Sequence, residues 1–172
     1  MEPIASIPGP NLALAAATAL IPLIMGFIWY NPKLFGKAWM EGAGLTEERA
    51  KGGNMFLILG LTFVFGFFYS VFLQMFSIHQ MNFGSILQPE LNYTDPQGFT
   101  EAIKQAADLS EHKFRTFRHG AVHGVVFSIV GLLPLVAIGS MFERRSWKYI
   151  LINWGYWAIC TILMAGIACQ FV

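Results

Sequence analysis

The residues best suited to chemistry in this sequence are histidines at the start of an apolar segment. His119 and His123 stand four positions apart, which on a helix places them about 40° apart on one face. His112 falls about 20° off the same line if the helix extends back that far. Imidazoles so spaced can bind one metal ion, ligate haem or relay a proton. His79, which ends the preceding apolar segment, is a candidate further ligand.

A structural role competes with that chemistry. Arg115 and His119 can mark the level of the lipid headgroups, with His123 one turn deeper and hydrogen-bonded to another helix. A His-x-x-x-His pair is a weak metal signal by itself, and Gly120 stands where zinc proteases carry a Glu. The sequence therefore names His119, His123 and His112 as metal-ligand candidates, with no catalytic residue and no resident cofactor beyond that metal or haem.

Small residues share the segment with these histidines at helical spacing: Gly120, Gly124, Ser128 and Gly131. Small side chains let another helix approach closely, either within the chain or in a second copy. We therefore expect a packing interface here. Pro134 predicts a kink further along the segment, and Pro22 predicts one in the first apolar segment. Kinked helices occur at transporter sites and also in many membrane helices without one.

The elements that must hold these residues are membrane helices. Apolar types make up 55% of the 172 residues and charged types only 12%, about half the charge of a soluble domain. Four charge-free stretches predict helices at about 10–30, 53–78, 119–142 and 149–171. Each reaches the roughly 20 residues that span about 30 Å of hydrocarbon. We predict an all-α polytopic membrane protein, a four-helix transmembrane bundle forming a single domain over residues 1–172.

The connection over residues 79–118 is the one sizeable extramembrane loop that this division leaves. After a turn at Asp95–Gly98, apolar residues recur near helical spacing, with charged residues between them. The apolar set is Phe99, Ile103, Ala106, Phe114 and Phe117. This pattern predicts a short amphipathic helix on the membrane surface or running into the third span, with a solvated linker as the alternative.

The basic residues orient the bundle. Loops 31–52 and 143–148 hold four and three Lys or Arg residues, seven together, whereas loop 79–118 holds four. The positive-inside rule therefore predicts that loops 31–52 and 143–148 are cytoplasmic and that both termini lie outside, in a multi-pass protein of the plasma membrane. The net charge of +1 provides no field that would attract nucleic acid.

Several short motifs resemble those of a known bacterial family. The first is Trp29, Tyr30, Asn31 and Pro32, which we read as an aromatic membrane-interface motif. It is followed by the stretch 34–39, by His119–Gly120, by Glu143–Ser146 and by Asn153–Trp157. Together these resemble domain-of-unknown-function family 1761 over nearly the whole chain. The resemblance implies a small four-helix protein of the bacterial inner membrane and brings no established activity.

Three functions of different classes fit these observations. The favoured one is a non-enzymatic scaffold, regulator or self-associating subunit, whose partners are the lipid bilayer and a second copy or another membrane protein. The second is a small oligomeric transporter or channel, against which stands the absence of charged residues deep in any span. The third is a metal- or haem-binding redox protein that uses the histidines of the third segment.

Overall fold

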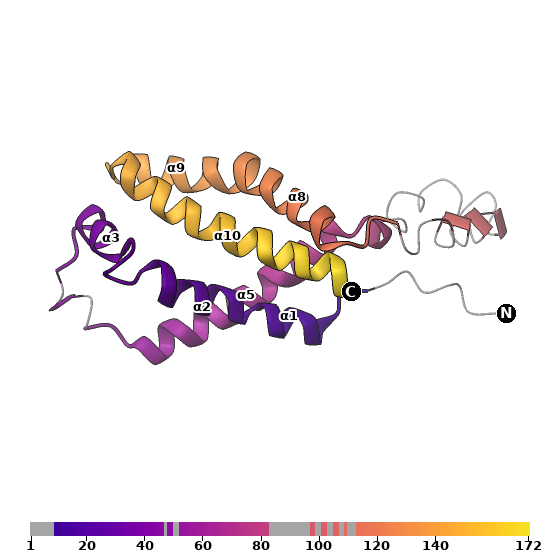
Figure 1. Ribbon diagram of the computed structural model, residues 1–172, viewed down its shortest axis with the longest axis horizontal. Coiled ribbons are helices and arrows are strands. Elements are labelled where there is room, and N and C mark those ends of the chain that lie inside the picture. Colours follow the sequence, from indigo (N-terminus) through magenta and orange to yellow (C-terminus); the bar gives the residue numbers. More distant parts are fainter. Residues whose placement is uncertain are drawn as a thin grey trace.

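The computed structural model describes residues 9–46, 48–49, 52–82, 97–98, 101–102, 105–106, 109 and 113–172 (Figure 1). Within those ranges all regular secondary structure is helical. Four helices are long and apolar enough to cross a membrane: Leu12–Trp29, Met55–Ser77, Phe117–Phe142 and Trp147–Phe171. Their ends lie within two residues of the predicted ones. The all-α class with four membrane-spanning helices is therefore confirmed.

Several of these helices are subdivided, and a short one lies outside the spans. The elements are α1 (Leu12–Thr18), α2 (Leu20–Trp29), α3 (Gly36–Ala43), α5 (Met55–Ser77), the 3₁₀ turn η1 (His79–Asn82), α8 (Phe117–Phe127), the π-helical turn η2 (Ser128–Leu132), α9 (Leu133–Phe142) and α10 (Trp147–Phe171). Polar side chains begin the long helices: Asn54 caps α5, Thr116 caps α8 and Ser146 caps α10.

Two prolines coincide with interruptions in the spans. Pro22 has no N–H to donate to the Thr18 carbonyl. The first span is interrupted just after Thr18, between α1 and α2. Pro134 likewise removes a donor, and the wider turn η2 lies immediately before α9. The indole Nε1 of Trp154 donates to the Ser128 carbonyl within this turn at 2.8 Å. Both interruptions lie where the sequence predicted kinks.

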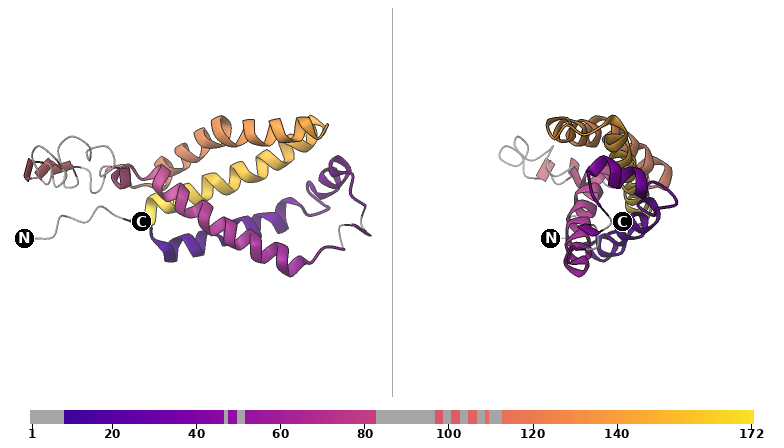
Figure 2. Two further views of the ribbon diagram at one scale, coloured as in Figure 1. Left: turned by 180° about the vertical axis from the view of Figure 1, so that it is seen from behind. Right: turned by 90° about the vertical axis from the view of Figure 1, so that its left-hand side faces the viewer.

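Helix α10 is the centre of the bundle. It runs between the α8–α9 segment on one side and α2 with α5 on the other, as the views in Figures 1 and 2 show. Half of its most apolar stretch is buried, against 11–22% for the other three spans. The outward faces of those three carry large exposed apolar side chains, such as Phe65, Val130 and Leu135. Such faces are suited to contact with lipid chains.

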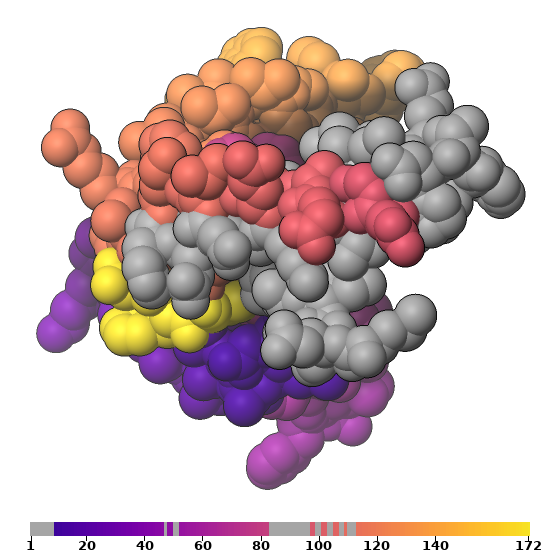
Figure 3. All heavy atoms as spheres, turned by 90° about the vertical axis from the view of Figure 1, so that its right-hand side faces the viewer, coloured from indigo at the N-terminus to yellow at the C-terminus, as the bar shows by residue number. Residues whose placement is uncertain are grey.

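The two ends of the bundle carry different structures. At one end lie η1, the start of α8 and the end of α10 (Figure 1). Figure 3 views that end and shows the last residues of α10 between α1 and the chain that leads into α8. At the other end lie α3 and the turn from α9 to α10 (Figure 1). This arrangement places loops 31–52 and 143–148 at the same end.

Helix α3 was not predicted. It occupies the loop between the first two spans and ends at Gly44, whose φ of 65° is the left-handed conformation that glycine adopts at low cost. Its apolar side packs on α10, which compensates for its short length. In loop 79–118, residues 97–98, 101–102, 105–106 and 109 have helical backbone. Over residues 113–116 the chain is not helical, since Phe114 has a φ of 64° and Thr116 is extended, so the predicted helix does not run on into the third span. Its other residues lie outside the described ranges.

Candidate metal centre

Three histidines converge where the second and third spans meet the loop between them. His79 is the first residue of η1, and His119 and His123 lie on the first two turns of α8. The Nε2 atom of His119 lies 3.1 Å from Nε2 of His79 and 3.0 Å from Nε2 of His123. One ligand nitrogen from each residue lies within 4.8 Å of the other two. The structure thus brings a residue from forty positions away onto the predicted pair.

Local backbone structure sets this convergence. Thr116 begins α8 in an extended conformation, and its hydroxyl accepts the N–H of His119 at 3.2 Å. Helix α5 ends at Ser77, and the chain turns at once into η1. The amide of Gln80 donates to the Lys113 carbonyl at 3.1 Å, which ties η1 to the segment that enters α8. The two chain segments that carry the histidines are therefore joined directly.

The end of α10 holds the same segment from the other side. The Arg115 guanidinium donates to the Val172 carbonyl. The Phe117 N–H donates to the Gln170 side chain at 2.9 Å, and the Cys169 thiol donates to the Phe114 carbonyl at 3.1 Å. The entry to α8 is thus fixed between η1 and α10. This fixes the backbone from which His119 projects.

Aromatic rings border the cluster, and one side is open. The edge of Phe76 meets His123 with ring centroids 5.8 Å apart, and Phe114 packs against His119 at 5.0 Å. His79 is exposed, whereas His119 and His123 are half-buried. An exposed ligand admits an ion and leaves room for a further ligand. The exposed ring of His79 therefore gives an ion access to the site.

The geometry suits a bare transition-metal ion. Tetrahedral coordination at about 2.05 Å puts neighbouring nitrogen ligands about 3.3 Å apart, close to the 3.0 and 3.1 Å separations between Nε2 atoms. Three imidazoles with a fourth open position can hold zinc, copper, nickel or iron. Two imidazoles that ligate one haem must approach from opposite faces of the porphyrin. His119 and His123, one turn apart on one helix, cannot do so.

His112, the third predicted ligand, lies outside the described residues. The small-residue stripe lies within them. A Cβ on Gly124 would come within 2.7 Å of the Ile162 Cα, and one on Gly120 would meet Ala165. Both glycines therefore pack against α10 of the same chain. Ser128 donates to the Gly124 carbonyl at 2.6 Å, whereas a Cβ on Gly131 would meet a side chain of its own helix, Phe127.

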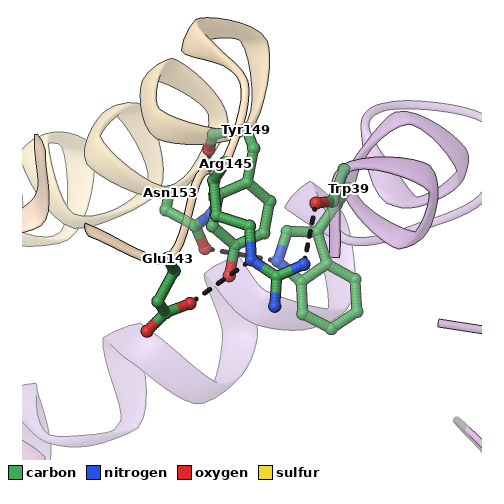
Figure 4. A network of polar contacts seen from close by, with 6 residues as sticks. Trp39, Glu143, Arg145, Tyr149 and Asn153 are labelled. Atoms are coloured by element: carbon green, nitrogen blue, oxygen red, sulfur yellow. Dashed lines mark hydrogen bonds and ion pairs between the residues drawn. The ribbon is translucent and has the colours of Figure 1, made fainter. Parts of the chain in front are cut away.

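The aromatic motif lies at the opposite end, where it contacts α10. Trp29 Nε1 donates to the Ile152 carbonyl at 3.0 Å. The Tyr30 hydroxyl donates to Asn153 Oδ1 at 3.1 Å. Trp39 Nε1 donates to the same oxygen at 3.2 Å (Figure 4).

The other two residues of that motif form the turn into α3. The Asn31 carbonyl accepts the N–H groups of Leu34 and Gly36 at 2.9 and 3.0 Å, and Pro32 follows in the turn. A Cβ on Gly36 would lie within 2.9 Å of the Asn31 oxygen, so only glycine allows this close return of the chain. The motif therefore shapes the loop as well as carrying aromatic rings.

Sequence reasoning missed the hub of this network. The sequence named Asn153 only as the first residue of the motif 153–157. It accepts two hydrogen bonds from distant aromatic residues, and its amide donates to the Tyr149 carbonyl at 2.9 Å. Beside it, Arg145 donates to the Gly42 carbonyl at 3.2 Å and pairs with Glu143 at 3.3 Å (Figure 4). The cost of an amide inside a span was the available indication.

Comparison with known proteins agrees with the motifs. Neither the curated proteins nor the solved structures yield a match to this chain. A family model described as a protein of unknown function, DUF1761, matches residues 12–169. This range includes the first three spans, all but the last two residues of the fourth, the three clustered histidines and the aromatic motif. The chain belongs to the DUF1761 family.

Proposed function

We propose that this membrane protein binds one transition-metal ion through His79, His119 and His123. The observation that carries the proposal is the approach of three imidazole nitrogens, one from η1 and two from α8, to within 4.8 Å of one another. Where two neutral imidazole nitrogens face each other, only one of them can carry the proton of the hydrogen bond. A metal cation, in contrast, accepts the lone pairs of all three ring nitrogens at once. Zinc and copper are the ions that this ligand type suits best.

The site lies at the end of the bundle that the distribution of basic residues assigns to the outside. An ion would reach it from the extracytoplasmic face, because His79 is the exposed member of the cluster. The chain would then act as a receptor for the ion at the membrane surface. A redox role additionally requires an ion that changes valence, for which copper or iron qualifies and zinc does not.

The two other functions have weaker support. Self-association through the small-residue stripe loses its argument, because Gly120 and Gly124 are already in contact with α10. Transport finds support in the interrupted spans, and it is compatible with a metal site. Zinc flux into proteoliposomes at no more than the rate of protein-free vesicles would reject transport and leave metal binding intact.

Metal titration of the detergent-purified full chain tests the proposal. After chelation and dialysis, we expect one Zn²⁺ or Cu²⁺ per chain by elemental analysis, and a visible absorption band of tetrahedral type with Co²⁺. His79→Ala, His119→Ala and His123→Ala should each weaken binding by at least about 100-fold, because even loss of a supporting residue costs 10–100-fold. Wild-type protein that binds none of the three ions would reject the proposal.

His112→Ala is the matched control, since it changes the remaining histidine of the chain. We expect it to bind metal as the wild type does. If this variant loses binding as well, the ligand set contains His112, as the helical spacing suggested, and the three-histidine set is wrong. Circular dichroism of all four variants should show unchanged helix content, because alanine favours a helix at least as well as histidine does.

A further inference from the structure

A second candidate site lies at the opposite end of the bundle from the histidines. A cavity of about 770 Å³ opens between α2 and α5, a volume typical of sites for small organic ligands. Phe27 from α2, Met40 from α3 and Ile58 from α5 line it, together with Tyr156 from α10. The lining is mostly apolar.

The crossing of the first two spans explains the cavity. A Cβ on Gly66 of α5 would lie 3.2 Å from the Ala19 carbonyl, so the two spans touch closely there. From this contact toward loop 31–52, the cavity is lined by the later residues of α2 and the earlier residues of α5. At Gly26, a Cβ would meet only the Tyr156 hydroxyl, at 3.8 Å. The two spans thus touch at Gly66 and leave space between α2 and α5 on the side of loop 31–52.

The cavity extends from hydrocarbon depth to the headgroup level. Its walls from α2 and α5 belong to the membrane-spanning helices. Its remaining lining includes Asn31, Leu45 and Arg49 from the loop that joins those spans. An apolar compartment that ends in polar loop residues matches a molecule with a hydrocarbon chain and a polar head. A compact polar solute would leave the apolar walls without a partner.

Arg49 gives the mouth of the cavity a positive charge. Within the described part of the chain, its guanidinium has no carboxylate partner, whereas Arg145 at the same end is paired with Glu143 at 3.3 Å. Guanidinium groups bind phosphate oxygens in a bidentate manner and attract anionic lipid headgroups. The charge therefore selects an anionic head over a zwitterionic one.

We propose that this cavity binds one anionic phospholipid, with an acyl chain between α2 and α5 and the phosphate at Arg49. The site shares no residue with the histidine cluster, so it stands independently of the metal proposal. The bound lipid fills the space that the two spans leave open, and it thereby becomes part of the packed structure at this end.

Native mass spectrometry of the delipidated full chain tests this assignment. The protein is titrated with an equal mixture of phosphatidylglycerol and phosphatidylcholine that carry the same acyl chains. We expect one retained phosphatidylglycerol per chain, preferred about fivefold over phosphatidylcholine. Arg49→Gln should still retain a lipid but lose the preference. Phosphatidylglycerol and phosphatidylcholine retained equally by the wild type would overturn the proposal, as would an unchanged preference in Arg49→Gln.

A pair of glycine substitutions locates the lipid. Gly26→Leu projects into the cavity and should abolish retention, whereas Gly60→Leu on α5, which lies outside the cavity and meets nothing within 4 Å, should leave it unchanged. Thr62→Phe fills the cavity from α5 and serves if Gly26→Leu does not fold. Retention in the folded cavity-filling variants equal to that of Gly60→Leu would overturn the assignment.

Discussion

Asn153 shows how a single polar residue joins distant parts of a membrane protein. Its side chain takes hydrogen bonds from Tyr30, at the end of the first span, and from Trp39 in α3. Both donors lie more than a hundred positions away in the sequence. Hydrogen bonds between membrane helices are worth about 0.6 kcal/mol each on average, whereas a donor left unpaired and buried costs about 1–3 kcal/mol.

We predict that Asn153→Leu lowers the free energy of unfolding in detergent by about 1–3 kcal/mol, because it leaves both donors without an acceptor. Tyr30→Phe removes one donor and leaves Asn153 paired with Trp39, so it should cost about 0.6 kcal/mol. Thermal unfolding followed by circular dichroism measures both. Equal stability of Asn153→Leu and Tyr30→Phe would show that the network does not depend on the amide.

At the scale of elements, the closest contact is that between α8 and α10. Gly120 and Gly124 allow the backbones to approach, and Trp154 of α10 donates to a carbonyl in the π-helical turn that follows α8. The contact has a second consequence, since the same helix turns carry His119 and His123. Packing against α10 thus sets the rotation of α8 and turns both imidazoles toward η1.

Gly124→Ala should destabilise the bundle, because its Cβ would lie 2.7 Å from the Ile162 Cα. Overpacking of this kind costs about 1–3 kcal/mol, or roughly 2–12 °C in the unfolding temperature of a chain this long. Gly139→Ala is the control: its Cβ would meet nothing within 4 Å, and alanine favours the helix by about 1 kcal/mol over glycine. The two variants should shift the unfolding temperature in opposite directions. A stabilising Gly124→Ala would contradict close packing.

At the scale of the whole molecule, the spans divide the chain into two chemically different ends. The histidines, the start of α8 and the end of α10 share one end. Helix α3, the aromatic network and the cavity share the other, together with seven of the eleven basic residues. The positive-inside rule assigns this second end to the cytoplasm.

Cysteine labelling in cells tests that orientation. The native Cys160 and Cys169 are buried, so a membrane-impermeant maleimide should react little with the parent chain. We expect Gln97→Cys to be labelled in intact cells, and Lys33→Cys to be labelled only after permeabilisation. The reverse pattern would invert the bundle and place the histidine cluster on the cytoplasmic side.

Composition predicted the spans because burial in lipid leaves a signal that needs no tertiary information. The helical spacing predicted that His119 and His123 share a face, because this too needs no tertiary information. It could not choose between His79 and His112 as their companion, because that depends on where α5 ends relative to α8. Helix α3 escaped prediction since its short, glycine-containing sequence has little helix propensity, and packing on α10 compensates for this. The cavity depends on how two spans cross, which their sequences do not encode locally.

The central place of α10 has a consequence for biosynthesis. The ribosome completes the first three spans before the helix that they surround, so these spans enter the bilayer while Gly120, Gly124 and the Tyr30 hydroxyl still lack their partners on α10. Assembly of the bundle must therefore follow release of the last span from the translocation machinery. A nonsense codon at Trp147 would leave an unassembled product for membrane proteases, even though three of the four spans had been made.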